Sequence, residues 1–430
     1  MSKNVTGPDA ADPGLPSDTL AADDGKSIAR THDPAMTTEA PANGQRASEL
    51  DSSLASDLVV DDTSDAAERT WVASPWELVW WRFTRHRVAV IGMIVVILFY
   101  LVAIFCEFVA PANPDTIDGL HKYVPPQQIS FLDANGEFTV RPGVYGLQPH
   151  RDPVTLRLTY TSNPQEWYPI YFFTTGPEYR LWGLIPLNVH LLGLGPNQDQ
   201  PFFLLGSDRL GRDMFSRIVY ASRISLSIGL VGVALSLLLG IILGGISGYY
   251  GGTIDTVIQR VIEFLRSMPT IPLWLALAAA MPPQWPPLYV YFGITVILSF
   301  LGWTRLAREV RGRFIALRDE DFVLAARLVG SGEMRIIWRH LVPSFLSHII
   351  AVITLAIPGM ILSETALSFL GLGLRPPVIS WGVLLQDAQN VQTVALYPWL
   401  LYPAIAVVVV ILSFNFMGDG LRDAADPYGR

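Results

Sequence analysis

Residues able to carry out chemistry are sparse in this chain of 430 residues. One triplet, Gly25-Lys26-Ser27, resembles the end of the glycine-rich loop that cradles nucleotide phosphates. That motif also needs a preceding strand and a first glycine at position 20, where this chain has Leu20. We therefore expect no nucleotide on this chain, and any ATP to be bound by another one.

Metal binding and nucleophilic catalysis are also not expected. The single cysteine, Cys106, lies in an apolar stretch, and the histidines, including His121, His150 and His190, show no metal-ligand spacing. We predict no catalytic residues, no cofactor and no metal, because a membrane enzyme would need clustered polar groups at depth.

Ionisable groups within the apolar segments are few. They are Glu107, His348 and Glu364. Such a group costs several kcal/mol unless it faces protein, water or a partner. Glu364 could line a pathway or contact a subunit, or lie at the outer membrane interface. An ion-coupled secondary transporter, the alternative class, would need more paired ionisable groups and an internal repeat.

Composition indicates a polytopic membrane protein with a polar tail. Half of the residues are hydrophobic, only 16% are charged, and the apolar residues come in long blocks. Residues 1–70 hold 14 acidic and 5 basic residues, few aromatics and no periodicity. We predict that this tail is disordered, and we do not expect a secretory signal peptide in it.

The apolar blocks predict six transmembrane helices, because about 20 apolar residues cross the hydrocarbon layer. The block 267–304 is interrupted by the prolines of 282–287 and is expected to form two spans joined by a tight turn. The other expected spans are Val88–Ala110, Ile224–Ile254, Leu341–Leu370 and Leu396–Met417. Eight arginines between 305 and 339 favour a cytoplasmic location for that loop and for both termini.

The segment from Phe322 to Pro343 contains two short amphipathic helical patterns. Phe322, Ala325, Ala326 and Val329 fall on one helical face, and we expect Asp319 to cap the first helix. Gly330 and Gly332 allow a sharp turn, Ser331 could cap the second helix, and Pro343 is expected to end it. Such a pair could lie on the lipid surface or dock in a partner's groove.

Several stretches resemble a known family. Ala325-Ala326, Gly330 and Pro343 have the spacing of the EAA loop of membrane subunits of binding-protein-dependent ABC importers, although Leu324 replaces the usual glutamate. The longer stretches resemble the C-type permease of oligopeptide and dipeptide importers: WWRFTRHRVAVIG (80–92), LLGSDRLGRDMFSRIVYASRISLSIGL (204–230), GYYGGTIDTVIQR (248–260), ETALSFLGLGLRPPVISWG (364–382) and SFNFMGDGLRDAADP (413–427).

The resemblance implies a transporter subunit in a bacterial inner membrane. Its partners would be a second homologous permease, two cytoplasmic ATPases that bind ATP and Mg, an extracytoplasmic solute-binding protein and membrane lipid, with no nucleic acid. Segment 319–343 would transmit force to an ATPase. The residues expected to act in this coupling are Ala325, Ala326, Gly330, Glu333, Arg339, His340 and Pro343.

Three further features have structural and functional interpretations. Gly240, Gly244 and Gly248 allow close helix packing, although Gly244 could also line a pathway. Pro269 and Pro272 could break the third span at a pathway or only kink its approach to the membrane. The charged stretch 207–217 could pair internally or contact the binding protein.

The remaining part of the chain, residues 111–205, is an outer segment with sequence patterns typical of β-strands. Asn135-Gly136 predicts a hairpin, and residues 155–160 and 167–173 are expected to be further strands.

Relatives with this framework import peptides, oligosaccharides, opine-like compounds or nickel, so the substrate stays open. The expected division is a tail (1–70), an anchor with the first span (71–110), a β-rich insert (111–205), a transmembrane domain (206–420) containing loop 319–343, and a cytoplasmic end (421–430).

Overall fold

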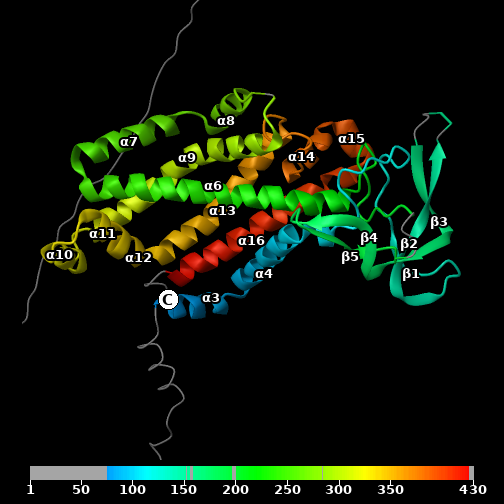
Figure 1. The fold of residues 1–430 in the computed structure, drawn as a ribbon, viewed down its shortest axis with the longest axis horizontal. Coiled ribbons are helices and arrows are strands. Elements are labelled where there is room, and N and C mark those ends of the chain that lie inside the picture. Colours follow the sequence, from blue (N-terminus) through cyan, green and yellow to red (C-terminus); the bar gives the residue numbers. More distant parts are fainter. Residues whose placement is uncertain (1–74, 152, 155–157, 196–199, 283, 426–430) are drawn as a thin grey trace, which may run out of the picture. The chain divides into compact units, whose positions relative to one another are not determined.

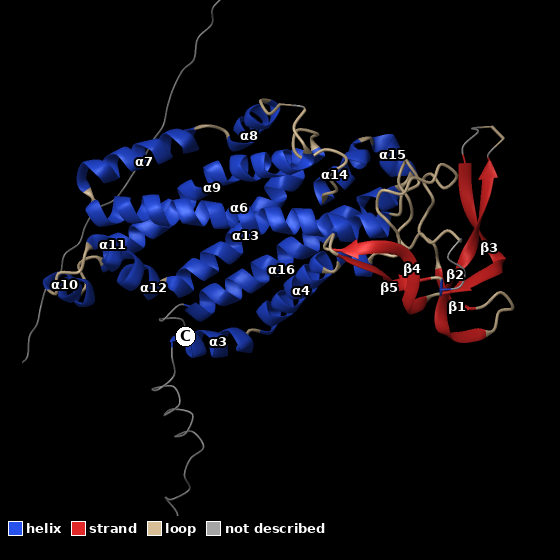
Figure 2. Ribbon diagram, in the orientation of Figure 1, coloured by secondary structure: helices blue, strands red, loops and turns tan. Residues whose placement is uncertain are grey.

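The computed structural model describes residues 75–151, 153–154, 158–195, 200–282 and 284–425 (Figure 1). The acidic tail and its Gly25-Lys26-Ser27 triplet lie outside the described residues. The described chain is mostly helical, with a small β-rich insert at one end of the helices, as predicted (Figure 2).

Among the residues that the structure describes, five helices are long and apolar enough to cross a membrane. They lie side by side, with α6 against α9, α13 against α16, and α16 against α4 (Figure 1). The first two begin with side-chain caps, from His86 in α4 and Asp213 in α6. The five helices are α4 (Arg87–Ile104), α6 (Met214–Tyr250), α9 (Pro287–Leu317), α13 (Leu346–Phe369) and α16 (Tyr402–Ala425), the last preceded by the 3-10 turn η4 (Pro398–Leu401).

The third expected span is short and follows a sharp bend, which agrees with the break or kink expected at Pro269 and Pro272. Helix α8 (Thr270–Ala279) has ten residues, which at 1.5 Å per residue cover about 15 Å, half of the hydrocarbon thickness. It follows α7 (Gly252–Ser267) at an angle of 85°, so only the bent pair could count as a sixth span. The break falls at Met268, whose backbone is extended because a proline follows it.

The start of α6 also differs from the prediction. The helix begins at Met214, ten residues before the expected Ile224. A carboxylate oxygen of Asp213 accepts a hydrogen bond from the Ser216 amide at 2.7 Å and caps the helix there. A charged first turn is thus part of the long helix, although its composition suggested a separate approach segment.

The outer insert contains two small antiparallel sheets. One has the order β1 (Ile129–Leu132), β2 (Phe138–Arg151), β3 (Leu158–Pro169), and the other pairs β4 (Tyr171–Leu181) with β5 (Ile185–Gly193). The Asn135-Gly136 hairpin is confirmed, since Gly136 has a φ of 78° between β1 and β2. The β-structure expected at 167–173 is confirmed except at Ile170, but it is divided between two strands, because the chain leaves one sheet at Pro169 and enters the other at Tyr171, with Ile170 buried between them. Of 155–160, the described residues 158–160 lie in β3.

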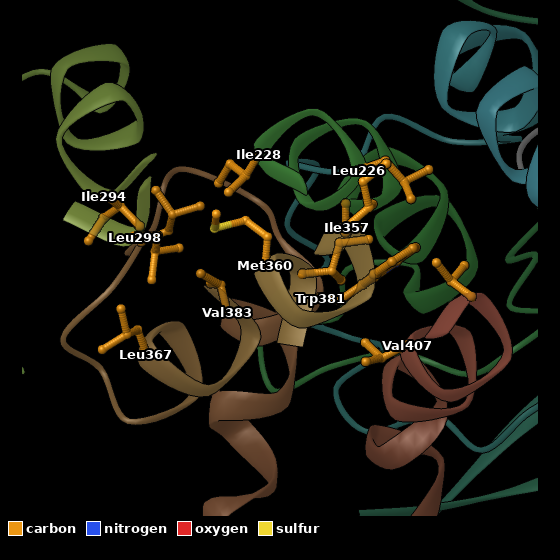
Figure 3. Packing of buried hydrophobic residues seen from close by; sticks show 14 of the residues in the cluster. Leu226, Ile228, Ile294, Leu298, Ile357, Met360, Leu367, Trp381, Val383 and Val407 are labelled. Carbon is orange, nitrogen blue, oxygen red and sulfur yellow. The ribbon is translucent and has the colours of Figure 1, made fainter. Parts of the chain in front are cut away.

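The largest apolar core lies between the spans (Figure 3). Trp381 is fully buried in it and contacts Phe99 edge to face at 6.1 Å between ring centroids. Trp381 begins α14 (Trp381–Leu385), one of the short helices that fill the space between long ones. The other short helices outside loop 319–343 are α3 (Pro75–Arg85), α5 (Cys106–Val109), the 3-10 turn η3 (Gln386–Gln389) and α15 (Val391–Leu396).

A stripe of glycines brings α6 and α9 into close contact. A Cβ atom at Gly240 would lie 2.7 Å from the Leu306 Cβ, and one at Gly244 would overlap the carbonyl oxygen of Ala307. Gly248 faces Phe314 in the same way. Since lipid tails are as apolar as side chains, close backbone contact of this kind is what holds helices together in a membrane. The packing interpretation of this stripe therefore agrees with the structure.

We predict that Gly244→Ala destabilises the helix pair by about 1–3 kcal/mol, because the added methyl group has no room beside the Ala307 carbonyl. The matched control is Gly312→Ala in α9, where a Cβ atom meets nothing within 4 Å and the change favours the helix by about 1 kcal/mol. Thermal unfolding in detergent measures both. Equal stability of the two variants would contradict the packing role.

Candidate coupling surface and substrate cleft

The loop after α9 forms a compact helical segment. It consists of α10 (Asp321–Leu328), α11 (Glu333–Ile336), the π-helix η2 (Ile337–Leu341) and α12 (Val342–Ser344), which we call the coupling segment. Gly330 ends α10 with a φ of 80°. The Gly330 amide donates to the Arg327 carbonyl at 2.9 Å and the Ser331 amide donates to Ala326 at 3.0 Å. These two bonds form a Schellman motif, and glycine suits its left-handed position.

The predicted caps of this segment are wrong. Helix α10 begins after Glu320, and its N-cap makes no side-chain hydrogen bond, while Asp319 accepts from the Arg318 guanidinium at 3.3 Å. The residue before α11 is Gly332, so Ser331 does not occupy the cap position. The Ser331 amide instead belongs to the Schellman motif, and the backbone hydrogen bonds of that motif determine where the second helix begins.

Pro343 does not end the helix as predicted. It lies in α12, inside a helical run that continues from α11 through η2 to Ser344, so the helix ends one residue later than predicted. The preceding π-helix, with its wider hydrogen-bond spacing, carries the chain up to α12. The actual break comes at Phe345, directly before α13.

The coupling segment has one anchored face and one exposed face. Val323 of α10 is fully buried, in a cluster with Phe314 of α9 and Leu341 of η2. On the other side, Leu328 is 89% exposed and Val329 is 86% exposed. The four residues expected on one face point mostly outward, with Phe322, Ala325 and Val329 exposed and Ala326 half-buried.

Polar contacts fasten this segment to the end of α6, and a further pair joins α9 to α7 nearby. The Tyr250 hydroxyl donates to Glu333 at 2.6 Å, and the Arg327 guanidinium lies 5.2 Å from the Tyr249 ring centroid. Arg311 of α9 donates two hydrogen bonds of 2.5 Å to Asp255 of α7. Glu333 therefore works within the chain, as part of the attachment.

The other predicted coupling residues lie on the outside of the segment or close to it. Arg339 and Pro343 are exposed, and His340 is half-buried. Sequence reasoning missed the tyrosine pair 249–250 as an attachment. The available signal was its position at the end of a long span, directly before Gly251 and Gly252, which both have a positive φ.

A cleft of about 680 Å³ lies between the long helices, lined by residues of α6, α7, α8, α9, α13 and α16. Glu309 and Trp274 line it, and their Oε2 and Nε1 atoms have no hydrogen-bond partner within the described chain. Glu309 also accepts from Arg305 at 3.3 Å. The other charged or ionisable residues in its lining are Arg266, His348 and Arg422. Pro269, at the α7–α8 break, is exposed next to Thr270 of this lining, and any pathway role for it stays a prediction.

Glu364 lies elsewhere, in the interior of the chain. It is fully buried, and its carboxylate accepts hydrogen bonds from Ser368 and Ser380 at 2.8 Å and from Ser225 at 3.2 Å. These serines belong to α13, the start of α14 and α6. Glu364 thus joins three elements and does not line the cleft, and Gly244 is likewise covered by α9.

The charged stretch 207–217 is paired internally. Asp208 is buried and accepts from Arg212 at 2.7 Å, with Arg217 at 3.5 Å. Arg209 reaches Asp387 at 3.3 Å. Burial raises the pKa of Asp213 to about 6, although hydrogen bonds from Ser216 oppose this effect. These contacts hold the outer end of α6.

Much of the chain is similar in sequence to known proteins. Residues 237–428 match the family "Binding-protein-dependent transport system inner membrane component", and residues 74–126 match "N-terminal TM domain of oligopeptide transport permease C". The oligopeptide transport system permease protein OppC of Bacillus subtilis (strain 168) is 36% identical, over 54% of this chain and 73% of that protein. The dipeptide permease DppC of the same strain is 39% identical, over 54% and 70%. A MetNI methionine ABC transporter structure aligns at a TM-score of only 0.39 with 17% identity, covering 49% of this chain and 97% of that chain.

The five or six candidate spans make the chain a multi-pass membrane protein of the transporter class. It belongs to the family of binding-protein-dependent transport system inner membrane components. It is a permease subunit of the oligopeptide and dipeptide type of ABC importer, part of a complex with an ATPase and a binding protein, and it is not an enzyme. The predicted family is confirmed, and the ion-coupled carrier is set aside.

We predict that Glu364→Leu lowers the yield and thermal stability of the chain. Each buried serine hydroxyl left without its acceptor costs about 1–3 kcal/mol. Glu364→Gln keeps an oxygen for Ser368 and Ser380 and should be close to the parent. The measurement is thermal unfolding in detergent, followed by uptake. A stable Glu364→Leu protein without transport would mean that the carboxylate acts in translocation.

Proposed function

We propose that this chain and a second homologous permease form the pathway of an importer in a bacterial inner membrane. Both termini would be cytoplasmic, and two cytoplasmic ATPases would drive the pair. An extracytoplasmic binding protein would deliver the substrate to the outer end. We keep the division into tail, anchor, insert (111–205) and transmembrane domain (206–420) as part of this proposal.

The two-faced coupling segment carries the proposal. A segment that transmits movement must be fixed to the helices that it moves, and it must also expose a surface to the ATPase that moves it. Val323 and Leu341 fix the segment in a buried cluster, whereas Leu328 and Val329 are almost fully exposed. Exposed apolar side chains of this size, next to the small residue Ala325, fit a groove on an ATPase better than they fit water.

Peptides are the substrate class that the relatives support best. Their names specify oligopeptide and dipeptide transport, and one relative, from Pectobacterium atrosepticum, is a glutathione permease with 37% identity. The cleft agrees with a substrate carrying both charges, because its lining contains arginines and Glu309. Oligosaccharides, opine-like compounds and nickel are the alternatives for the same machinery.

We expect Gly330→Val to uncouple ATP hydrolysis from uptake. Valine at a φ of 80° costs about 1–2 kcal/mol and disturbs the Schellman turn that orients α10. Gly332→Val is the matched control, because Gly332 has an ordinary extended backbone with a φ of −65° and no atom within 4 Å of a Cβ. Uptake and ATPase activity are measured on the reconstituted complex. Equal losses in both variants would contradict the role of the turn.

The partners are tested by tagging the chain and identifying the proteins that co-purify from native membranes in mild detergent. We expect a second permease and an ATPase with the parent chain, and loss of the ATPase with Leu328→Glu, which places a charge in the proposed contact. Leu120→Glu, at a 78% exposed position in the outer part, is the control and should keep the ATPase.

Recovery of the chain alone, or only with copies of itself, would overturn the proposed assembly. Retention of the ATPase by Leu328→Glu would keep the assembly but exclude this face of the coupling segment as the contact. The ligand on a recovered binding protein would identify the substrate class.

A further inference from the structure

The β4–β5 hairpin has an unusual number of exposed apolar side chains. Phe172 and Phe173 on β4 are 61% and 69% exposed, and Leu184 in the turn is 78% exposed. Trp182 and Ile185 are about half exposed, at 51% and 47%. We call these five residues the hairpin surface. In a soluble domain such a concentration marks a contact with another molecule.

The hairpin surface is fastened to the end of the first span. The Trp182 indole donates a hydrogen bond to the carbonyl oxygen of Ile104, the last residue of α4, at 2.9 Å. The Trp182 ring lies 5.9 Å from the Phe105 ring, and Phe173 lies 5.9 Å from Phe108. The turn of the hairpin is therefore level with the last turn of a membrane-spanning helix (Figure 1).

This end of α4 exposes an apolar face that continues into the hairpin surface. Ile104 is 44% exposed and Phe105 is 37% exposed. Farther down the helix the exposed side chains are Leu101, Leu98, Ile97, Ile94 and Ile91. In a membrane-spanning helix such a face meets lipid tails. The hairpin surface extends the same face beyond the end of the helix.

The backbone holds two of these aromatic residues in an uncommon conformation. Phe173 and Trp182 have φ values of 54° and 53°, in the left-handed region that bulky residues rarely occupy. Trp182 contacts the residues at the end of α4, and Phe173 contacts Phe108 of α5. For Trp182 this conformation belongs to the tight turn between the strands, whose other central residue, Gly183, has a φ of 74°, and for Phe173 it lies at the contact with Phe108.

We propose that the β4–β5 hairpin enters the outer interfacial layer of the lipid bilayer beside α4, as an accessory membrane anchor for the insert. Tryptophan favours this layer, where an apolar ring and a polar group are both accommodated. The depth is limited to the interface, because strand edges in the hydrocarbon core would leave backbone groups without partners. The occupant is lipid and not a second protein, since the surface is continuous with the lipid-facing side of α4.

The proposal depends on α4 crossing the membrane and not on the coupling or substrate assignments. A nitroxide label at Leu184→Cys tests it in the purified complex, reconstituted in lipid nanodiscs. The only native cysteine, Cys106, is fully buried, and the unmutated chain reports any background labelling. The matched control is Val140→Cys on β2, which is 89% exposed on a strand of the other sheet. Ile185→Cys is used in place of Leu184→Cys if the Leu184→Cys protein does not fold.

We expect the Leu184 label to collide several-fold more often with oxygen, which partitions into lipid, than with a water-soluble nickel chelate. The Val140 label should show the reverse order. Equal access of nickel to both labels would overturn the proposal, since the hairpin would then be in water. Protection of the Leu184 label from both reagents would also overturn it, because a protein would then cover the surface.

Discussion

The close contact between α6 and α9 is the interaction on which the rest of the chain depends. Lipid offers no hydrophobic drive for helices to associate, so the fit of backbones at Gly240, Gly244 and Gly248 has to supply it. Helix α6 has 37 residues and is about 55 Å long at 1.5 Å per residue. One rigid element therefore runs from the ion pairs around Asp208 to Tyr250 at the coupling segment.

The buried polar side chains of the described residues fall into two sets: some have hydrogen-bond partners for their polar atoms, and others have a polar atom without a partner. Glu364 has three serine donors, and Glu107 receives two hydrogen bonds from Arg223, at 2.7 and 2.5 Å. Fully partnered groups of this kind hold helices in register. Within the described chain, seven buried side-chain atoms lack a hydrogen-bond partner, and two of them belong to Glu309 and Trp274, which line the cleft.

The two ends of the molecule use apolar side chains in opposite ways. At the coupling segment, Leu328 and Val329 are exposed on a helix whose other face is buried, which suits a protein contact. At the outer end, the hairpin surface continues the exposed side of α4, which suits lipid. The position of each patch relative to a membrane-spanning helix separates the two, although their composition is similar.

The sequence by itself determined the membrane class, five of the spans, the Asn135-Gly136 hairpin and the Gly330 turn. These depend on local properties, namely the length of apolar runs and the left-handed backbone that glycine permits. Only the tertiary structure decided the caps, the fate of Pro343 and the division of residues 167–173 between two sheets. Those outcomes depend on which backbone bonds and buried neighbours are available. The tertiary structure alone also placed Glu364 among three serines. Ser225 and Ser380 are 139 and 16 residues away from Glu364 in sequence, and they meet it only through helix packing.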